Sequence, residues 1–338
     1  MNDESVDINT IRNMEHKPLQ FAVNSILPHG LFILAGSPKV GKSWLVLDMC
    51  IAIAVGGDIW GYKANQNGVL YYALEDNWRR INDRVNHLDA EKKDMSGFRV
   101  KLTAPGISTG LIEEIDRHMD NYSNTSLIVI DTFEHIRNRD TTKQTLYSAD
   151  YSDIKALRQI TNKYDITLLL VHHTRKMNDE NDPINNISGS TGLTGATDGN
   201  WVLEKVKRIE YHAKLTINNR DTEGFCFDLK FNPDTCHWEY IGNSTGVDNA
   251  DEDISLLLND FLQNEWQGTA TELCKALLKQ DPKANITPTN LSKQLRRIDE
   301  FLQKEHCIKT SFKKSGNVKK IIFQRLAENQ NQERREQP

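Results

Sequence analysis

One run of eight residues, from Gly36 to Ser43, constrains this chain more than any other feature. It reads Gly-Ser-Pro-Lys-Val-Gly-Lys-Ser, and it stands between an apolar stretch at 31–35 and a helix-forming stretch at 44–55. A glycine-rich turn between a buried strand and a helix points backbone N–H groups and the positive end of the helix dipole at one place, where phosphate oxygens bind. The run therefore predicts a P-loop that binds a nucleoside triphosphate.

Two side chains of this run have expected roles in handling phosphates. The Lys42 ammonium is expected to reach the β- and γ-phosphates of ATP, and the Ser43 hydroxyl to bind Mg²⁺. The other members of the run and the residue after it are expected to line the nucleotide: Gly36, Ser37, Pro38, Lys39, Val40, Gly41 and Trp44. ATP and Mg²⁺ are thus the expected ligands.

The composition is that of a globular protein, with 38% hydrophobic and 26% charged residues. The length of 338 residues allows two domains of about 100–200 residues each. A formal net charge of −5 excludes a polycation, so any nucleic-acid contact must come from a local patch. The five cysteines include no Cys-x-x-Cys pair, and residues 1–15 contain no apolar signal core. These features predict a cytoplasmic protein with reduced thiols.

Apolar stretches alternate with helix-forming stretches through the first half of the chain. Further strands are expected at 69–74, 99–103, 126–131 and 166–171, and helices at 111–122, at 152–163 and in a segment ending at His87. Apolar strands separated by helices are typical of a parallel sheet covered on both faces. Antiparallel strands are expected to close this sheet at 201–204, 213–217, 225–231 and 238–241. The predicted fold class is α/β, with a mainly parallel sheet flanked by helices.

Acidic side chains follow two of these strands directly, where parallel sheets bind ligands. Asp131 follows four apolar residues, the Walker B arrangement, and is expected to bind Mg²⁺ together with Ser43. Because Thr132 and not an acid follows Asp131, the carboxylate that orients the attacking water must come from elsewhere. Glu75, at the end of the 69–74 strand, is the expected catalytic carboxylate, with Asp76 as the alternative.

Two histidines, His172 and His173, follow another strand beside the expected phosphate site. Either could hydrogen-bond the γ-phosphate or its water and transmit hydrolysis to the polar loop expected at 177–195. The alternative is a pair of structural histidines, and a zinc site would need further ligands. Arg175 and Lys176, which come next, are candidates for contact with DNA.

Four motifs in this order resemble the RecA-fold ATPases typified by the RepA-like hexameric replicative helicases of plasmids, phages and integrative elements. They are the P-loop, Tyr-Tyr-Ala-Leu-Glu75-Asp76, Val-Ile-Asp131-Thr and Val-His172-His173-Thr-Arg-Lys, and the resemblance covers about residues 20–242. It implies a homo-oligomeric ring, usually a hexamer, with ATP at subunit interfaces and single-stranded DNA in the channel. It also implies that Glu75 is the catalytic glutamate and that His173, or His172, couples nucleotide to DNA.

A ring ATPase of this kind also needs a cation supplied by a neighbouring subunit. Related RecA-fold proteins carry Lys or Arg after a late strand and before a glycine-containing turn, the position of Arg220 here. The lysine that often stands two positions earlier is Asn218 in this chain. Arg220 is therefore the expected arginine finger, and the alternatives are Lys205, Lys207 and Arg208.

The last third of the chain predicts a second, smaller domain. The expected divisions are an extension at 1–20, the ATPase domain at 21–242, a polar linker at 243–253, a small domain at 254–326 and a disordered tail at 327–338. Within 254–326, three helical stretches precede two alternating strands around a turn at 315–317. Three helices and a basic hairpin resemble a winged helix, an α+β domain.

This small domain is the basic part of an acidic protein. Between Asp281 and Arg325 eleven Lys and Arg residues face four acids, a formal charge of +7. Such a concentration predicts contact with duplex DNA, although solvated lysine faces and protein contacts are the alternatives. The expected DNA-binding residues are Lys293, Arg296, Arg297, Lys313, Lys314 and Lys319.

Together these features predict an ATP-hydrolysing motor acting on DNA, most specifically a RepA-like replicative helicase of a mobile genetic element. One alternative is a DNA-dependent ATPase that does not unwind, such as a recombinase-like protein or a loader. Another is an ATP-gated regulator that binds duplex DNA through the small domain. Primase chemistry is not indicated, because the sequence has no zinc-binding cluster or separate acidic triad.

Overall fold

The protein is described here from a computed structural model, whose residues form two compact units. The first unit ends at Gly242 and the second begins at Asn243. The described residues are 5–15, 17–89, 91–137, 146–175, 182–206, 211–243, 249–263, 265–282, 284, 286–299, 302–303, 306–315 and 318–326. The predicted tail at 327–338 lies outside them. No helix in these ranges is both long enough and apolar enough to cross a bilayer.

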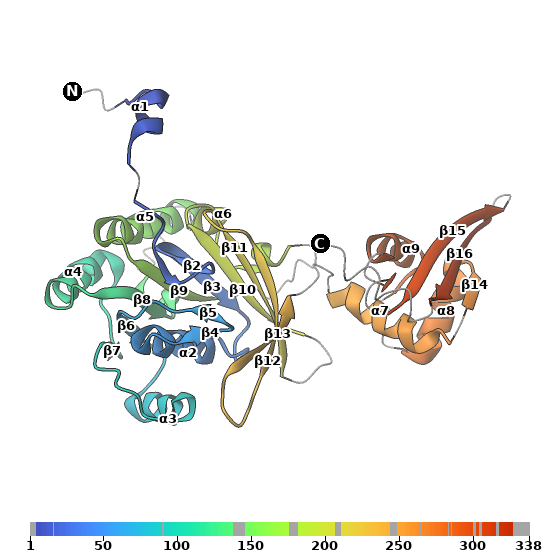
Figure 1. Ribbon diagram of the computed structural model, residues 1–338, viewed down its shortest axis with the longest axis horizontal. Coiled ribbons are helices and arrows are strands. Elements are labelled where there is room, and N and C mark those ends of the chain that lie inside the picture. Colours follow the sequence, from blue (N-terminus) through green and yellow to red (C-terminus); the bar gives the residue numbers. More distant parts are fainter. Residues whose placement is uncertain are drawn as a thin grey trace. The chain divides into compact units, whose positions relative to one another are not determined.

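A nine-stranded sheet forms the centre of the first unit (Figure 1). In spatial order its strands are β13 (Trp238–Asn243), β12 (Phe225–Phe231), β11 (His212–Asn219), β10 (Gly199–Lys205), β3 (Gly30–Gly36), β9 (Thr167–His173), β8 (Thr125–Asp131), β6 (Gly68–Ala73) and β7 (Phe98–Lys101). All neighbours from β10 to β7 pair in parallel. The predicted fold class is therefore confirmed.

The prediction that 201–204 begins the antiparallel part was wrong, because β10 pairs in parallel with β3. The chain direction changes one strand later, where β11 pairs antiparallel with β10 and β12 with β11. The reason lies in the lengths of the connections. A parallel neighbour needs a crossover of about a dozen residues or more, which 174–198 supplies and 206–211 does not.

Helices cover both faces of this sheet. Helices α2 (Lys42–Val55) and α3 (Trp78–Leu88) share one apolar core with β3, β6, β8 and β9. Helices α4 (Leu111–Asn121), α5 (Leu146–Tyr164) and α6 (Thr191–Gly195) share the core on the other face. Figure 1 shows these two layers with the sheet between them. Residues within each strand alternate between the two cores, which decides the side on which each site residue lies.

Short elements complete the first unit. They are α1 (Ile8–Asn13), β1 (Phe21–Val23), β2 (Leu27–Pro28), β4 (Asp58–Ile59), β5 (Tyr62–Lys63), and the 3₁₀ turns η1 (Ile107–Thr109), η2 (Phe133–Ile136) and η3 (Pro183–Asn186). Helix α5 starts at Leu146, six residues before its predicted start at 152. Tyr147 and Tyr151 in its first turns are exposed. The buried apolar residues that predict the helix begin at Ile154, so the sequence pattern does not mark the first turns.

The polar stretch predicted as a loop at 177–195 contains two short helices in its described part, η3 and α6. The Asp182 side chain accepts from the Ile184 N–H and Pro183 follows it, so the first turn has the usual capping residues. Helices of four or five residues are too short to show an apolar repeat. Composition alone therefore could not distinguish them from a loop.

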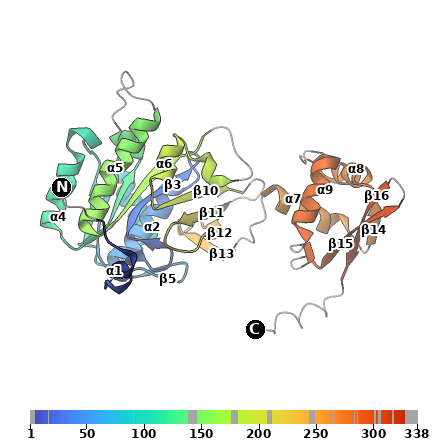
Figure 2. The same cartoon turned by 90° about the horizontal axis from the view of Figure 1, so that it is seen from above.

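The second unit combines helices with a sheet (Figure 2), and the sheet has three strands. Its elements are α7 (Asn249–Phe261), β14 (Glu265–Gly268), α8 (Ala270–Gln280), α9 (Pro288–Arg297), β15 (Ile308–Ser315) and β16 (Val318–Arg325), and the sheet order is β14-β16-β15. A capping box between Thr269 and Glu272 starts α8, and Thr287 caps α9. Helix α7 begins inside the predicted linker, and β14 is an element that the sequence did not predict.

Replacing Gly199 by alanine tests the packing between β10 and its neighbours. A Cβ atom at Gly199 would lie 2.3 Å from the Asn219 Oδ1 atom and 2.6 Å from the Phe32 ring. Asn219 also accepts from the buried Trp201 indole at 3.0 Å, so it cannot move freely. We expect Gly199→Ala to lower the free energy of unfolding by about 2 kcal/mol, seen as a lower urea midpoint.

The control for this experiment is Gly195→Ala, because a Cβ there would meet nothing within 4 Å. Its urea midpoint should equal that of the wild type within error. Equal midpoints for all three proteins would contradict the packing argument.

Candidate active site

The predicted site residues converge because the strands that carry them are parallel and adjacent. Gly36 of β3 lies opposite His173 of β9, and Asp131 of β8 lies opposite both Val171 and Ala73 of β6. Four strands thus end at one edge of the sheet. Helix α2 begins at the same edge, since it follows β3 after five residues.

The loop between β3 and α2 has the backbone of a phosphate cradle. Gly41 is the N-cap of α2 at a φ of 107°, and Lys39 also has a positive φ of 63°. No side chain of the described residues caps α2, which leaves its first-turn N–H groups for a ligand. The exposed Ser37, Pro38 and Lys39 form the rim of this loop, and Val40 is buried under it.

Lys42 carries the cation of the loop, and its side chain is buried. The ammonium donates to the Gly36 carbonyl at 2.8 Å and to the Ser37 carbonyl at 3.0 Å. Burial lowers the pKa of Lys42 to about 8, although the negative charges of Asp131 and Glu75 oppose this shift. An anion bound beside the ammonium would raise this pKa and stabilise the charged form.

Asp131 is buried at the end of β8, beside the start of α2. Its Oδ2 atom accepts from the Tyr71 hydroxyl at 2.9 Å, and its carboxylate also accepts from Ser43. Burial raises the pKa of Asp131, while those two hydrogen bonds and Lys42 lower it. A buried carboxylate next to a serine hydroxyl supplies the hard oxygen ligands that Mg²⁺ prefers, so this pair fits that ion.

The two acids after β6 differ sharply in their surroundings. Half of the Glu75 side chain is exposed, and its Oε1 atom accepts from the Thr132 hydroxyl at 3.3 Å with His135 at 3.8 Å. The Asp76 carboxylate is buried and accepts from Arg80 at 2.8 Å and from Arg84 at 2.6 Å. Glu75 is therefore the acid that can reach a water at the site, and Asp76 holds α3 in place.

Successive side chains of β9 point to opposite faces of the sheet, so His172 and His173 lie on different faces. His173 shares its side of the sheet with Val171 and α2, and its buried Nδ1 atom has no partner among the described residues. His172 faces the other core, where it packs edge-on against Phe133 with ring centroids 5.6 Å apart. Burial lowers the pKa of His172 to about 4, so this ring is neutral at pH 7. His173 is thus the histidine on the nucleotide side.

Residues 182–195 contact the end of β9 and the first part of α5. His172 Nε2 lies 3.1 Å from the Ser188 carbonyl, and the Ser188 N–H donates to the His173 carbonyl at 3.0 Å. Asp150 of α5 accepts from the Ser190 N–H at 2.8 Å and also from the guanidinium of Arg137, which follows η2. The exposed Arg175 donates from Nε to the Ile187 carbonyl at 3.2 Å. Lys176 lies outside the described residues.

Arg220 lies at the opposite edge of the sheet from the P-loop, because β11 runs antiparallel to β10. Its Nη2 atom donates to the Gly195 carbonyl at 2.6 Å, and its Nη1 atom lies 3.9 Å from Asp198. It cannot reach the phosphate site of its own chain. Of the alternatives, Lys205 ends β10 at the P-loop edge, and Lys207 and Arg208 lie outside the described residues.

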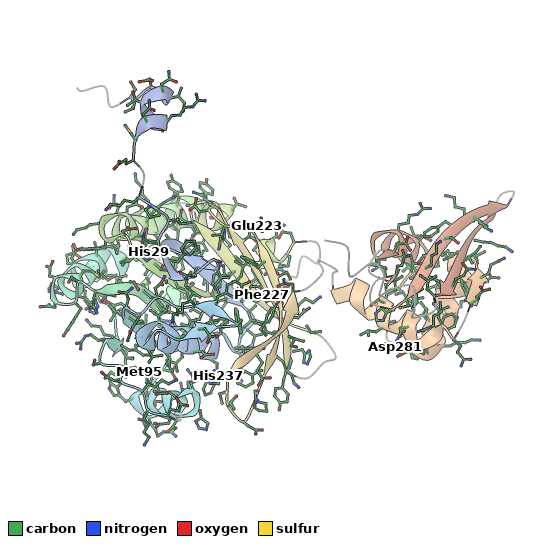
Figure 3. All side chains as sticks on the ribbon, in the orientation of Figure 1. His29, Met95, Glu223, Phe227, His237 and Asp281 are labelled. Atoms are coloured by element: carbon green, nitrogen blue, oxygen red, sulfur yellow. The ribbon has the colours of Figure 1, made fainter. Side chains whose placement is uncertain are left out.

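Several contacts of the site were not predicted from the sequence. The Trp238 indole of β13 donates to the Gly41 carbonyl at 3.2 Å, and Trp60 donates to the Trp238 carbonyl at 2.7 Å. His237, which is labelled in Figure 3, precedes Trp238 in the chain. It contacts Asp48 of α2 at 2.9 Å, and this bond raises the pKa of His237. The contact between Trp238 and the P-loop could not be predicted from a local sequence pattern, because Gly41 lies 197 positions away in the chain.

Among the residues predicted to bind DNA in the second unit, Arg296, Lys313 and Lys319 are exposed. The side chains of Lys293, Arg297 and Lys314 lie outside the described part of the chain. Each of these six residues belongs to α9 or to the β15–β16 hairpin.

Comparison with known proteins identifies the family and the fold. The AAA domain family matches residues 3–179. A protein solved as an ATPase domain is similar to 63% of this chain, over 85% of its own length, with a TM-score of 0.51 and 11% identity. A DnaB-like replicative helicase, solved in a study of its interactions with primase, is similar to 62% of this chain with a TM-score of 0.52 and 11% identity. The match spans only 57% of that helicase. Comparison with curated protein sequences found no match.

The pKa of Lys42 predicts how ATP affinity depends on pH. Below about pH 8 the Lys42 side chain is a charged ammonium in the free protein. Above about pH 8 it is a neutral amine, which must take up a proton when phosphate binds. We expect ATP affinity to fall at least about tenfold between pH 7 and pH 9.5, because each proton taken up weakens binding about tenfold per pH unit.

Calorimetry of ATP binding in two buffers of different ionisation enthalpy measures this proton uptake directly. At pH 9 the wild type should take up close to one proton per ATP, and Lys42→Arg, which stays charged, should take up none from this position. Equal uptake by the two proteins would contradict the assignment to Lys42.

Proposed function

This chain belongs to the AAA domain family, and on that premise we propose that it is an ATP-hydrolysing motor acting on DNA, of the replicative-helicase type. The observation that carries the proposal is the meeting of Lys42, Ser43, Asp131 and Glu75 at one edge of the sheet. A phosphate cradle, a metal-binding carboxylate and a second carboxylate that reaches solvent are what hydrolysis of a triphosphate requires. The similarity of the fold to a solved ATPase domain and to a DnaB-like replicative helicase supports the choice of motor.

We assign one task to each of these residues. The N–H groups of the loop and the Lys42 ammonium bind the phosphates, and Ser43 and Asp131 hold Mg²⁺. Mg²⁺, when bound, neutralises charge on the β- and γ-phosphate oxygens. Glu75 orients the attacking water and accepts its proton, with its own carboxylate positioned by Thr132. His173 presents its unpartnered Nδ1 atom toward the same side of the sheet.

The homo-oligomeric ring and single-stranded DNA in its channel are part of this proposal. Arg220 supports the ring, because its place at the far edge of the sheet leaves a neighbouring copy as the only phosphate site it could serve. The contacts of His172 and Asp150 with residues 182–195, and the bond from Arg137 to Asp150, support coupling between hydrolysis and a DNA-binding segment. A RepA-like helicase of a mobile genetic element is the most specific form of the proposal.

Replacing Glu75 by glutamine tests the catalytic assignment. The amide cannot accept a proton, so we expect ATP turnover to fall by about 10³-fold while ATP binding stays within about twofold of the wild type. Steady-state ATPase rates with and without single-stranded DNA measure this, with Glu113→Gln, an exposed acid of α4, as the control. Wild type and control should be stimulated by DNA. Unchanged turnover in Glu75→Gln would remove Glu75 from the mechanism.

Strand displacement from a forked substrate separates unwinding from ATP hydrolysis alone. The motor proposal expects displacement in ATP and none in a non-hydrolysable analogue. Stimulated ATPase activity without displacement would instead identify a loader or a recombinase-like protein.

Mixing two inactive variants tests whether Arg220 acts on a neighbour. Arg220→Ala keeps an intact P-loop, and Lys42→Ala keeps an intact arginine, so a mixed ring contains interfaces that combine both intact parts. For random assembly about one interface in four is complete, and the mixture should recover about a quarter of the wild-type ATPase rate. A mixture as inactive as its components would exclude Arg220 from a shared site.

A further inference from the structure

The second unit carries a concentrated positive charge that the ATPase site does not explain. Residues 281–325 have a formal charge of +7 although the whole chain has −5, which leaves −12 for the rest. Nine of the eleven basic residues and none of the four acids lie on α9 and on the hairpin of β15 and β16, which we call the basic hairpin surface.

The register of the hairpin places lysines directly opposite one another. Lys313 pairs with Lys320, and Lys314 pairs with Lys319. Like charges directly opposite in an antiparallel pair destabilise the hairpin. In the described part of the chain, no carboxylate lies within 4.0 Å of Lys313, Lys319 or Lys320. Because side chains alternate along a strand, the two pairs lie on opposite faces of the hairpin, and phosphates on either side of the hairpin would relieve the repulsion in both pairs.

Helix α9 extends this surface. Leu291 and Leu295 of α9 are buried in the core of the unit, whereas Thr289, Asn290 and Arg296 are exposed. The Arg296 guanidinium lies over the Phe312 ring of β15, 4.4 Å from its centroid. This contact joins α9 to the face of the hairpin that carries Phe312 and Lys319, whereas Lys313 and Lys320 lie on the opposite face.

We propose that the basic hairpin surface is a second nucleic-acid site, separate from the ATPase site, which binds duplex DNA. Helix α9 enters the major groove with Thr289 and Asn290 at its N-terminal end, and the paired lysines of the hairpin contact phosphates. In the chain, α7, α8 and α9 precede the β15–β16 hairpin. The site requires neither ATP nor the ring.

The chemistry of the surface distinguishes duplex DNA from other partners. Sites for single strands stack bases on exposed aromatic rings, but Phe323 is buried, Arg296 lies over Phe312, and the described part of this unit exposes no large aromatic side chain. A protein partner would need an exposed apolar centre. Leu256 of α7 is the only exposed large apolar residue in the described part of the unit, and it lies outside this surface.

The double variant Lys313→Ala/Lys319→Ala removes one lysine from each pair. We expect the full chain, without nucleotide, to bind a 30-base-pair duplex at least about tenfold more weakly than the wild type at 50 mM salt. The slope of log affinity against log salt should fall by about 2, one for each lost phosphate contact. Fluorescence anisotropy of a labelled duplex measures both quantities. The melting temperature at low salt should not fall, because the change relieves repulsion.

Lys275→Ala/Lys279→Ala, which removes two exposed lysines of α8 in the same unit, is the matched control and should bind like the wild type. Lys42→Ala should keep duplex binding while losing ATPase activity, so failure of the two proposals can be told apart. Three results would overturn the inference: equal duplex affinity in the two double variants, tighter binding of the wild type to the single strand than to the duplex, or binding of a polyglutamate peptide as tight as that of DNA.

Discussion

The parallel pairing of β3 with β9, of β9 with β8 and of β8 with β6 is the constraint on which the site depends. It brings Gly36, Asp131, His173 and the turn before Glu75 to one edge although they are distant in the chain. The fold around this edge also buries Lys42 and Asp131. Burying each of these charges costs several kcal/mol unless an opposite charge or hydrogen bonds compensate for the lost water. The lowered pKa of Lys42 is a consequence of this burial. An anionic ligand would compensate for the charge of Lys42, and a cation bound with that ligand would compensate for the charge of Asp131.

Strand alternation then divides the work between the two faces of the sheet. The face of α2 holds the P-loop, Asp131 and His173, and the opposite face holds His172, Phe133 and α5. His172 and His173 are neighbours on β9 but lie on opposite faces of the sheet. His173 is on the side of the phosphate site, and His172 contacts Ser188 within residues 182–195.

The sequence predicted the elements of the site well, since each motif is a local pattern. The P-loop is recognised within eight residues, and the apolar strand before Asp131 within six. Predictions failed where direction or pairing decided the result. The parallel course of β10 follows from the lengths of two connections, and the short helices at 183–195 have no apolar repeat. No local pattern showed how the surroundings of Glu75 and Asp76 differ, since two arginines contact Asp76 whereas Glu75 is half exposed.

The amino-acid sequence by itself predicted the kind of site, because phosphate, Mg²⁺ and proton transfer each require particular residue types at short fixed spacings. It also determined that the basic charge is concentrated in the last quarter of the chain. Only the tertiary structure decided which side chains meet there. Trp238 contacts Gly41 from 197 positions away, and Lys313 lies opposite Lys320 through the register of a hairpin. Such contacts depend on how strands pair, and strand pairing is a property of the whole sheet rather than of any local pattern.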